Sequence, residues 1–520
     1  MVMVLAPKMV HILAMLLAMP MVFQVCAAMQ DNFTDIALTD SMKMTMFQDD
    51  SEDFVHPWIK LQQNINYSKR RMAQAQDKPG PTDEELEEAI AKRAESVRRD
   101  QEAQGVKHFE FRPPRVKVGP RAVADDEPIV RSKRFGDNVD NERRSGSGSN
   151  RAGRDSDLEA RDSSGYSSTA ADAENSYSVT EAPNPSARNT AGLAIEANDV
   201  GYFVEVQIGS SNSKFKMLID SGSSDTWVTG SNCNGCGGSN RNKLSTSSSS
   251  SLKKSSDSYK ISYGTGSVSL TVASDKFQVA GLTLDKFSFG VASSESDDFG
   301  DSKIPFDGLI GLGGSGLSVT KKPTLVDALK KANKINQPIV GYRLGRAADG
   351  SDSNKGEITF GGVDQSQISG SLTQVDNQSG SGYWMVKLDS VSMDNKQVSG
   401  SGTAMLDTGT SLILAPKDAA DKIHNSIDGA KSDGQGGYTL PCTSDKQISF
   451  SIGGKTFTMD SRDLLFAPKN TNDLTGTCIS AISTGNTEEN ADWLLGAPFL
   501  KNVYFATNLD ANSIALGSLS

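Results

Sequence analysis

Leu218-Ile219-Asp220-Ser221-Gly222-Ser223-Ser224 and Met405-Leu406-Asp407-Thr408-Gly409-Thr410-Ser411 are two copies of one seven-residue pattern. In each copy, apolar residues precede an aspartate, and hydroxyl residues and a glycine follow it. Each copy is also followed, at nearly the same distance, by an apolar-apolar-Gly element. These elements are Leu309-Ile310-Gly311 and Leu494-Leu495-Gly496, whose glycines lie 91 and 89 residues after the two aspartates. The matched spacing predicts two similar lobes.

The sequence around these motifs has the pattern of a β protein. After Leu193 it consists of short apolar or alternating runs, such as 202–208 and 215–219, separated by Gly, Ser and Asn. Such runs predict strands. Helices are predicted only at 324–333 and 417–427, each preceded by a proline. We therefore expect an all-β, bilobal body with a few short helices.

The position of each aspartate favours acid–base chemistry. An aspartate between an apolar strand and a glycine-containing turn is presented from a buried strand end, where desolvation raises its pKa. Two such carboxyl groups, brought together by duplicated lobes, cannot readily both ionise and would share one proton. The ionised member can take a proton from water while the other polarises a carbonyl, which suits amide hydrolysis.

The neighbours of Asp220 and Asp407 fit this task. We expect one hydroxyl of each motif to bond across the pseudo-twofold axis, a second to bond the outer carboxylate oxygen, and the glycine to let the backbone approach closely. These residues are Ser221 and Thr408 across the axis, Ser223 and Thr410 at the outer oxygens, and Gly222 and Gly409.

Over about residues 195–520, these motifs resemble the pepsin family of aspartic proteases. The resemblance implies that Asp220 and Asp407 hold the lytic water and that no cofactor or metal takes part. It also implies an aspartic-type endopeptidase made as a zymogen and most active at acid pH, with protein or peptide substrates. The first motif has Ser221 where the family usually has threonine, which keeps the hydroxyl.

Further segments resemble other elements of the family. Tyr263-Gly264-Thr265-Gly266, which starts 43 residues after Asp220, resembles the tip of the flap that closes over the substrate. Trp227 corresponds to the indole that supports the flap tyrosine. Phe306 and Leu309 correspond to the wall of the pocket for the side chain before the scissile bond, although each could instead be an ordinary core residue.

Cysteine usage indicates an oxidising compartment. Four cysteines remain after Cys26 leaves with a signal peptide, and two disulfides are expected. The resemblance implies the pairs Cys233-Cys236 and Cys442-Cys478. A Cys-x-x-Cys pair could also be redox-active or half of a zinc site, but His424 is the only histidine after residue 190 to complete a cluster.

The N-terminal part of the chain is predicted to be processed. Residues 1–28 contain Lys8, an apolar run and small residues, as expected for a signal peptide. The run is shorter than the roughly 20 residues of a spanning helix. Residues 29–190 are predicted to be a largely disordered propeptide and Ser/Gly-rich linker, with a helix-prone stretch at 83–99. The catalytic lobes would follow at 191–370 and 371–520.

The propeptide is expected to act as an intramolecular inhibitor, although the sequence does not say which basic residue blocks the dyad. Basic clusters within it are typical of processing sites, but solvated charges would look the same. We expect maturation between Arg134 and Arg188. The basic clusters are Lys69-Arg70-Arg71, Arg98-Arg99, Lys133-Arg134 and Arg143-Arg144.

Charge and composition limit the partners. Residues 1–190 hold 55 of the 117 charged side chains, whereas residues 191–520 have a net charge of −6 and no basic stripe. Nucleic acid is therefore not an expected partner. Residues 516–520 include no apolar tail for a lipid anchor, so we expect a secreted monomer. Vacuolar or lysosomal delivery remains an alternative.

Four rival interpretations fit parts of the sequence. Residues 311–316 fit Gly-x-Gly-x-x-Gly, but no alternating strand-helix repeat surrounds them. A serine hydrolase would need a base and a Gly-x-Ser-x-Gly elbow, which the body lacks. A catalytically inactive binding protein of the same fold would be expected to lose an aspartate, a motif glycine or Tyr263, and none is lost. A cell-surface glycoprotein would explain the sequons at Asn32, Asn66 and Asn377 but not the paired motifs.

Overall fold

The computed structural model leaves some predictions outside the residues that it describes. These include the signal peptide at 1–28, the sequon at Asn32, Gly264 and Thr265 of the predicted flap, and the basic pairs between 104 and 164. The described residues are 56–76, 78–103, 165–176, 178–237, 241–263, 266–296, 299, 305–350, 353–486 and 493–520.

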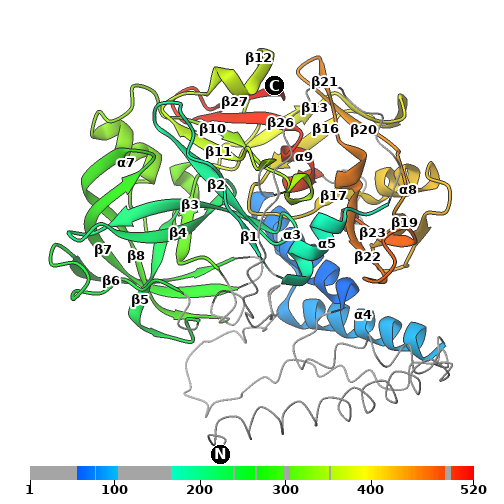
Figure 1. Ribbon diagram of the computed structural model, residues 1–520, viewed down its shortest axis with the longest axis horizontal. Coiled ribbons are helices and arrows are strands. Elements are labelled where there is room, and N and C mark those ends of the chain that lie inside the picture. The colour runs from blue at the N-terminus through cyan, green and yellow to red at the C-terminus, as the bar shows by residue number, and fades with distance from the viewer. Residues whose placement is uncertain are drawn as a thin grey trace, which may run out of the picture. The chain divides into compact units, whose positions relative to one another are not determined.

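The all-β, bilobal fold is confirmed. The first lobe is built on a large sheet of 14 strands, in which antiparallel pairs predominate (Figure 1). Nine of the 14 strands belong to this lobe, and those at 201–208 and 213–220 are largely buried, as the apolar runs predicted. The nine strands are β1 (Val179–Thr180), β2 (Thr190–Glu196), β3 (Gly201–Ile208), β4 (Ser213–Asp220), β5 (Thr226–Asn234), β6 (Lys253–Ser262), β7 (Ser267–Val279), β8 (Leu282–Glu295) and β9 (Gly308–Gly311).

The second lobe has one sheet of five strands and two sheets of four. The five-stranded sheet contains β13 (Met385–Leu388), β16 (Gly402–Leu406), β17 (Ile413–Pro416), β24 (Ile482–Asn486) and β25 (Trp493–Leu495). The smaller sheets contain β14 (Ser390–Met393), β15 (Lys396–Ser399), β20 (Ile448–Ile452) and β21 (Lys455–Thr458), and β18 (Lys431–Ser432), β19 (Tyr438–Pro441), β22 (Leu465–Pro468) and β23 (Thr477–Ser480).

Strands from distant parts of the sequence pair with one another and extend the large sheet beyond the first lobe. The large sheet continues from β2 into five strands, and the last two of the chain pair with strands more than a hundred residues earlier. The predicted lobe boundary at 370/371 therefore falls inside a strand. The five strands are β10 (Ile339–Arg343), β11 (Glu357–Phe360), β12 (Ile368–Asp376), β26 (Val503–Asn508) and β27 (Ser513–Leu519).

The duplicated motifs form the same strand arrangement in both lobes. In the first lobe, β4 pairs in parallel with β9, so that Asp220 lies opposite Gly311. In the second lobe, β16 pairs in parallel with β25, so that Leu406 lies opposite Leu495. The strand that follows each aspartate, β5 or β17, returns antiparallel to the other side of β9 or β25. The matched spacings of 91 and 89 residues therefore have a structural cause.

Both helices predicted within the body are present. α7 (Leu325–Lys331) is N-capped by Thr324, whose side chain and that of Asp327 form a capping box. α8 (Lys417–Asn425) follows Pro416. A short helix, α9 (Ala497–Leu500), follows the second apolar-apolar-Gly element.

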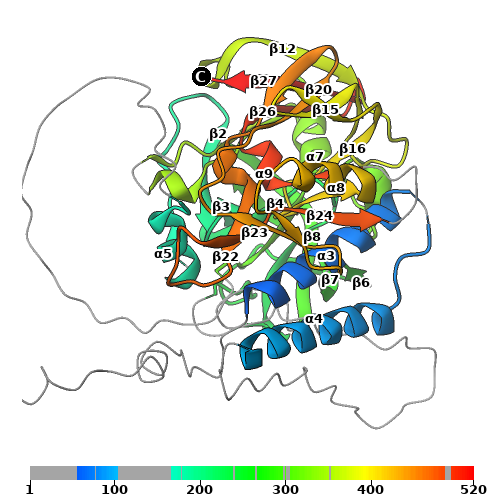
Figure 2. The ribbon, with the colours of Figure 1, turned by 90° about the vertical axis from the view of Figure 1, so that its right-hand side faces the viewer.

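Two helices of the predicted propeptide pack on the body. α4 (Asp83–Ala103) corresponds to the predicted helix-prone stretch, whereas α3 (Pro57–Ala75) was not predicted. They lie beside each other, with α4 at the lower edge of the body and α3 above it, toward the strands (Figure 1, Figure 2). Both belong to the compact unit that also contains the lobes. Within the predicted propeptide, the described residues 57–76 and 78–103 are therefore mostly helical.

The C-terminal end of the predicted linker also has structure, over the described residues 165–176 and 178–190. α5 (Ser168–Ser176) buries Ala170, Ala171 and Ala173 in the main core. The preceding Tyr166 donates its backbone N–H to the carbonyl of Leu474 at 2.6 Å, and β1 pairs with β2. The structured body therefore begins before residue 191, because short Ala-rich segments can pack although their composition is that of a linker.

Two of the predicted glycosylation sequons lie in the interior. Asn66 is 4% exposed and donates its side-chain amide to the carbonyl of Leu86. Asn377 is 9% exposed and donates to the carbonyl of Tyr383 and to the side chain of Asn512. A glycan on either nitrogen would require the loss of these bonds. In the described part of the chain, no helix is both long and apolar enough to cross a membrane.

Candidate active site

Asp220 and Asp407 meet where the two lobes come together. Asp220 ends β4 and Asp407 follows β16, and the two residues are 2% and 0% exposed. Each strand is buried because it lies between two others. One guanidinium nitrogen, Nη2 of Arg71, bonds Oδ1 of both aspartates, so the two carboxylates point at one spot.

The carboxylates have equivalent partners in the two lobes. The N–H of Gly222 donates to Oδ1 of Asp220 at 3.0 Å, and Ser223 Oγ donates to Oδ2 at 2.6 Å. The N–H of Gly409 donates to Oδ1 of Asp407 at 3.0 Å, and Thr410 Oγ1 donates to Oδ2 at 2.7 Å. The hydrogen bonds expected for Ser223 and Thr410 are therefore present. Charge-assisted bonds of this kind fix the orientation of a carboxylate.

Ser221 and Thr408 connect the lobes across the axis. Each residue donates its backbone N–H to the hydroxyl of the other at 3.0 Å. The Ser221 hydroxyl donates to the carbonyl of Leu406 at 3.2 Å, and that of Thr408 to the carbonyl of Ile219 at 3.3 Å. These four reciprocal hydrogen bonds connect the two strand ends, and the Ser221 hydroxyl makes the same kind of bonds in the first lobe as the Thr408 hydroxyl makes in the second.

Gly409 is required by close approach. A Cβ atom at this position would lie 2.6 Å from Oδ1 of Asp220, which is too close for any real contact. At Gly222, a Cβ atom would collide with the Arg71 guanidinium. The glycines therefore leave room for whatever lies between the carboxylates.

Arg71 occupies the space between the two aspartates. Its Nε donates to Oδ2 of Asp407 at 3.1 Å, and its Nη2 contacts Oδ1 of both aspartates. The side chain is 3% exposed and lies 5.4 Å above the ring of Tyr67. Although burial would lower it, the carboxylates of Asp220 and Asp407 raise the pKa of Arg71 well above its usual range. The guanidinium is therefore fully charged in this site.

Helix α3 carries Arg71 into the site. One face of the helix contributes Trp58, Leu61, Ile65 and Met72 to a cluster with Met405, Leu412 and Leu494 of the second lobe. Arg93 of α4 adds an ion pair with Asp433 and lies 5.0 Å from the ring of Trp58. Burial of apolar area on this face supplies the main attraction.

Asp220 differs from a carboxyl group in water. Burial raises its pKa, Arg71 lowers it and Asp407 raises it, and the balance leaves the pKa of Asp220 above its ordinary value. The shift has the direction expected for one member of a dyad that shares a proton.

Tyr263, the first residue of the predicted flap, is buried against Trp227. Trp227 Nε1 donates to the hydroxyl of Tyr263 at 2.8 Å, which gives the indole the supporting position expected from the family. Tyr263, Trp227, Phe306 and Leu309 belong to one apolar cluster of the first lobe, and all four are buried. This placement fits both interpretations of Phe306 and Leu309, as pocket wall and as core.

Both expected disulfides are present, Cys233–Cys236 and Cys442–Cys478. Among the described residues, one group has potential metal ligands close together, namely Cys233, Cys236 and Glu295. Its donors are already committed, since the sulfurs are bonded to each other and Glu295 is paired with Arg241 at 2.7 Å. This arrangement leaves no free ligand for a metal ion.

Two functional features were missed from the sequence, namely Arg71 and the helix that carries it, α3. Arg71 was grouped with Lys69 and Arg70 as a possible processing site, but it is buried in the dyad. The signal for its helix was the spacing of Trp58, Leu61 and Ile65, which places them on one helical face.

Comparisons with known proteins agree with this geometry. The family model described as "Eukaryotic aspartyl protease" matches residues 201–519. A protein of Arthroderma benhamiae named "Probable aspartic-type endopeptidase CTSD" is 37% identical over 347 residues, which are 66% of this chain and 66% of that protein. The match thus spans just under two thirds of that relative's length.

In two further relatives, the match to this chain covers a larger share of the relative's own length. "Aspartic-type endopeptidase ctsD" of Aspergillus fumigatus is 31% identical over 67% of this chain and 72% of that protein. "Rhizopuspepsin-1" of Rhizopus niveus is 35% identical over 62% of this chain and 80% of that protein. The expected resemblance is confirmed.

Proposed function

Because the chain belongs to the eukaryotic aspartyl protease family, we propose that it is a secreted aspartic-type endopeptidase, made as a zymogen, that hydrolyses peptide bonds of proteins at acid pH. The observation that carries the proposal is the convergence of Asp220 and Asp407, with equivalent hydrogen bonds, on one guanidinium nitrogen. Once Arg71 leaves, the same atoms can hold a water molecule.

The chemistry follows from a dyad with one proton. The ionised aspartate takes a proton from the water as its oxygen attacks the peptide carbonyl carbon. The protonated aspartate donates to the carbonyl oxygen, which gives a tetrahedral diol. The dyad then protonates the amide nitrogen while the diol releases a proton, and the C–N bond breaks. The dyad ends with the single proton with which it began. No covalent enzyme intermediate is needed.

The hydrogen bonds from Ser223 and Thr410 support this division of labour. Each hydroxyl donates to the Oδ2 atom of its aspartate, so the Oδ1 atoms remain directed toward the shared spot. The Tyr263 flap and Trp227 would exclude bulk water from the reacting atoms.

We further propose that residues 57–103 are an inhibitory prosegment and that Arg71 is the residue that blocks the dyad. Its guanidinium takes the place of the water and neutralises both carboxylates. Acid would weaken this contact by protonating a carboxylate, because the guanidinium itself stays charged. Arg71 cannot also serve as a processing site in this state, since its side chain is 3% exposed.

The rival function is a catalytically inactive binding protein of the same fold. It would have no use for a buried arginine that neutralises the dyad. The ion pairs of Arg71 with Asp220 and Asp407 therefore favour the enzyme, because an inactive relative would have no catalytic activity to inhibit.

The test is a digest of a protein mixture at acid pH, read by mass spectrometry. The secreted chain is used with and without a transition-state inhibitor of aspartic proteases. Inhibitor-sensitive cleavage between defined residues supports the proposal, and cleavage only near neutral pH or insensitive to the inhibitor would refute it. Sequencing the N-terminus of the secreted protein tests processing and secretion together.

A further inference from the structure

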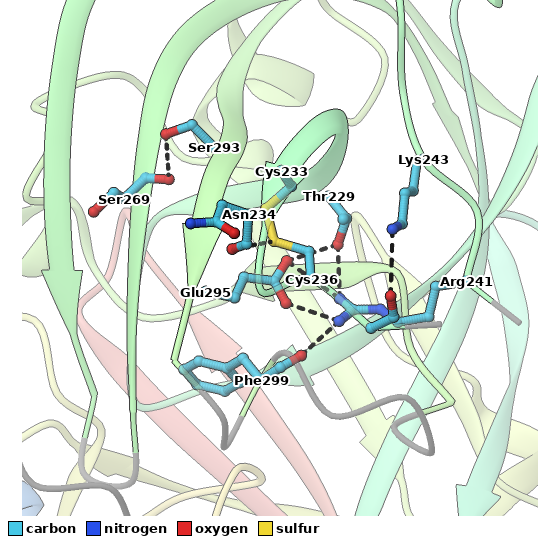
Figure 3. The surroundings of a disulfide bond; sticks show 11 residues. Thr229, Cys233, Asn234, Cys236, Arg241, Lys243, Ser269, Ser293, Glu295 and Phe299 are labelled. Carbon is cyan, nitrogen blue, oxygen red and sulfur yellow. Dashed lines mark hydrogen bonds and ion pairs between the residues drawn. A yellow bond between two sulfur atoms is a disulfide. The ribbon is translucent and has the colours of Figure 1, made fainter. Parts of the chain in front are cut away.

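Arg241 and Glu295 form a fully buried ion pair in the first lobe (Figure 3). Both side chains are 0% exposed, and Arg241 Nη1 lies 2.7 Å from Glu295 Oε2. Thr229 completes the group, since its hydroxyl donates to Glu295 Oε1 at 2.8 Å and accepts from Arg241 Nη2 at 2.7 Å. The three residues form a closed ring of charge-assisted bonds.

The guanidinium also contacts two aromatic residues, Phe299 and Phe306. Arg241 Nη1 donates to the backbone carbonyl of Phe299 at 2.5 Å, and the guanidinium lies 5.6 Å from the ring centre of Phe306. The Phe299 ring packs edge-on against Trp227 at 5.7 Å and against Tyr263 at 5.2 Å. The Arg241 guanidinium therefore fixes the backbone of Phe299 through a hydrogen bond and contacts the ring face of Phe306.

On the other side of the guanidinium, Glu295 and Thr229 belong to two paired strands next to a disulfide. Thr229 lies on β5 and Glu295 ends β8, and these two strands pair in parallel. The Cys233–Cys236 disulfide is next to the group, since its two sulfurs and a Glu295 carboxylate oxygen lie within 4.8 Å of one another (Figure 3). The paired strands and the nearby disulfide fix the position of the Glu295 carboxylate. The ion pair with this carboxylate in turn fixes the position of the Arg241 guanidinium.

Stability alone does not account for such a pair. Desolvation of two charges costs several kcal/mol each, and apolar residues of similar volume often stabilise a protein equally well or better. What the pair provides is geometry, because the guanidinium is planar and its donors have fixed directions. Lysine cannot hold Glu295, Thr229 and the Phe299 carbonyl in the same plane.

We propose that Arg241 is a positioning residue for substrate specificity, which shapes the pocket for the side chain before the scissile bond by holding Phe299 and Phe306. This inference rests on the proposed peptidase function. It assigns to Arg241 and Glu295 the choice among substrates, whereas Asp220 and Asp407 carry out the chemistry.

The test compares two peptides that differ only in the residue before the scissile bond, phenylalanine or alanine. The processed wild-type enzyme and Arg241→Lys are compared after titration of their active sites with a tight-binding inhibitor. We expect the ratio of kcat/KM for the two peptides to fall about tenfold in Arg241→Lys, the size of a small misfit in an apolar pocket. The fall should come mainly from the phenylalanine peptide.

The matched control is Arg346→Lys. Arg346 forms a similar ion pair with Asp463 at 2.6 Å, but it contacts none of the flap residues named above. This variant should lose thermal stability and keep the wild-type ratio. If Arg241→Lys also lowers stability but keeps the ratio per titrated site, its role is structural only and the inference is overturned.

A second variant covers the case in which Arg241→Lys fails to fold. Thr229→Val keeps the shape of the side chain and removes the hydroxyl that joins the two charges. It should lower the ratio in the same direction by a smaller factor, and an unchanged ratio would overturn the inference. Failure of the wild-type enzyme to cleave either peptide would instead refute the proposed function, and the inference with it.

Discussion

The release of the prosegment should depend on His56, which caps helix α3. The His56 Nδ1 atom accepts a hydrogen bond from the backbone N–H of Trp58 at 3.3 Å, and it must be neutral to do so. Burial lowers the pKa of His56 to about 4, with a further contribution from nearby Lys469, while Asp100 acts in the opposite direction. An undocked prosegment would expose the imidazole, which then titrates near 6.5.

The sign of the effect follows from this difference. Well above pH 6.5 the histidine is neutral in both states and docking does not depend on it. As the pH falls, the undocked state binds a proton that the docked state does not, so docking weakens. The loss is about 2 kcal/mol at pH 5, or about 30-fold in the docking equilibrium, and approaches about 3 kcal/mol below pH 4.

His56→Asn tests this reasoning, because asparagine can cap the helix but does not titrate. The rate of self-conversion of the full chain is measured from pH 6.5 to 4 for the wild type and the variant. We expect conversion of the variant to begin at a lower pH and to rise less steeply. His424→Asn is the control, since burial also lowers the pKa of His424 to about 4, but this histidine is on α8 of the second lobe, where its ring nitrogens contact the Ala420 carbonyl and the Ser480 hydroxyl. Identical pH profiles for His56→Asn and the wild type would refute the reasoning.

Three further predictions follow from buried contacts. Arg71→Met leaves two carboxylates unpaired beneath α3 and should weaken docking by about 3–5 kcal/mol, so that the uncut chain cleaves a small peptide that the wild-type zymogen does not; persistent latency would contradict this. Ser221→Ala removes two hydrogen bonds between the lobes and should lower the free energy of unfolding by about 1–3 kcal/mol in denaturant titrations, whereas an unchanged midpoint would mean that the lobes are held elsewhere. Lys501→Met removes the cation that Asp199 and Asp463 share. Asp463 keeps its pair with Arg346, and the loss at the buried Asp199 carboxylate should cost about 3–5 kcal/mol of stability in calorimetry. Lys417→Met, which breaks an exposed pair with Asp421, is its control, and equal losses would count against the burial argument.

The sequence was most informative where a local pattern had a local cause. Apolar residues before Asp220 and Asp407 predicted buried strands, and the equal spacing to Gly311 and Gly496 predicted a repeated structure, which proved to be a parallel strand pair. The helix predicted at 324–333 from the preceding proline is present, and the structure adds the capping box of Thr324 and Asp327 at its start.

The sequence was least informative where a partner lies far away along the chain. Arg71 is 149 residues from Asp220 and 336 from Asp407, so nothing near Arg71 distinguishes it from Arg70. The Arg241–Glu295 pair spans 54 residues and was not foreseen for the same reason. Composition was misleading for α5, because an Ala- and Ser-rich segment acquires structure only against the core that it covers.

The most direct test of the account is the activity of Asp220→Asn and of Asp407→Asn. Each variant is freed of its prosegment by a protease of another class, and its kcat/KM on an acid-pH peptide is compared with that of wild-type enzyme prepared identically. The account predicts that both variants fold with wild-type thermal stability or better and that each loses at least about a thousandfold in kcat/KM, since either amide ends the exchange of protons with water. Retention of substantial activity by either variant would contradict the claim that the two carboxyl groups act as a single catalytic unit.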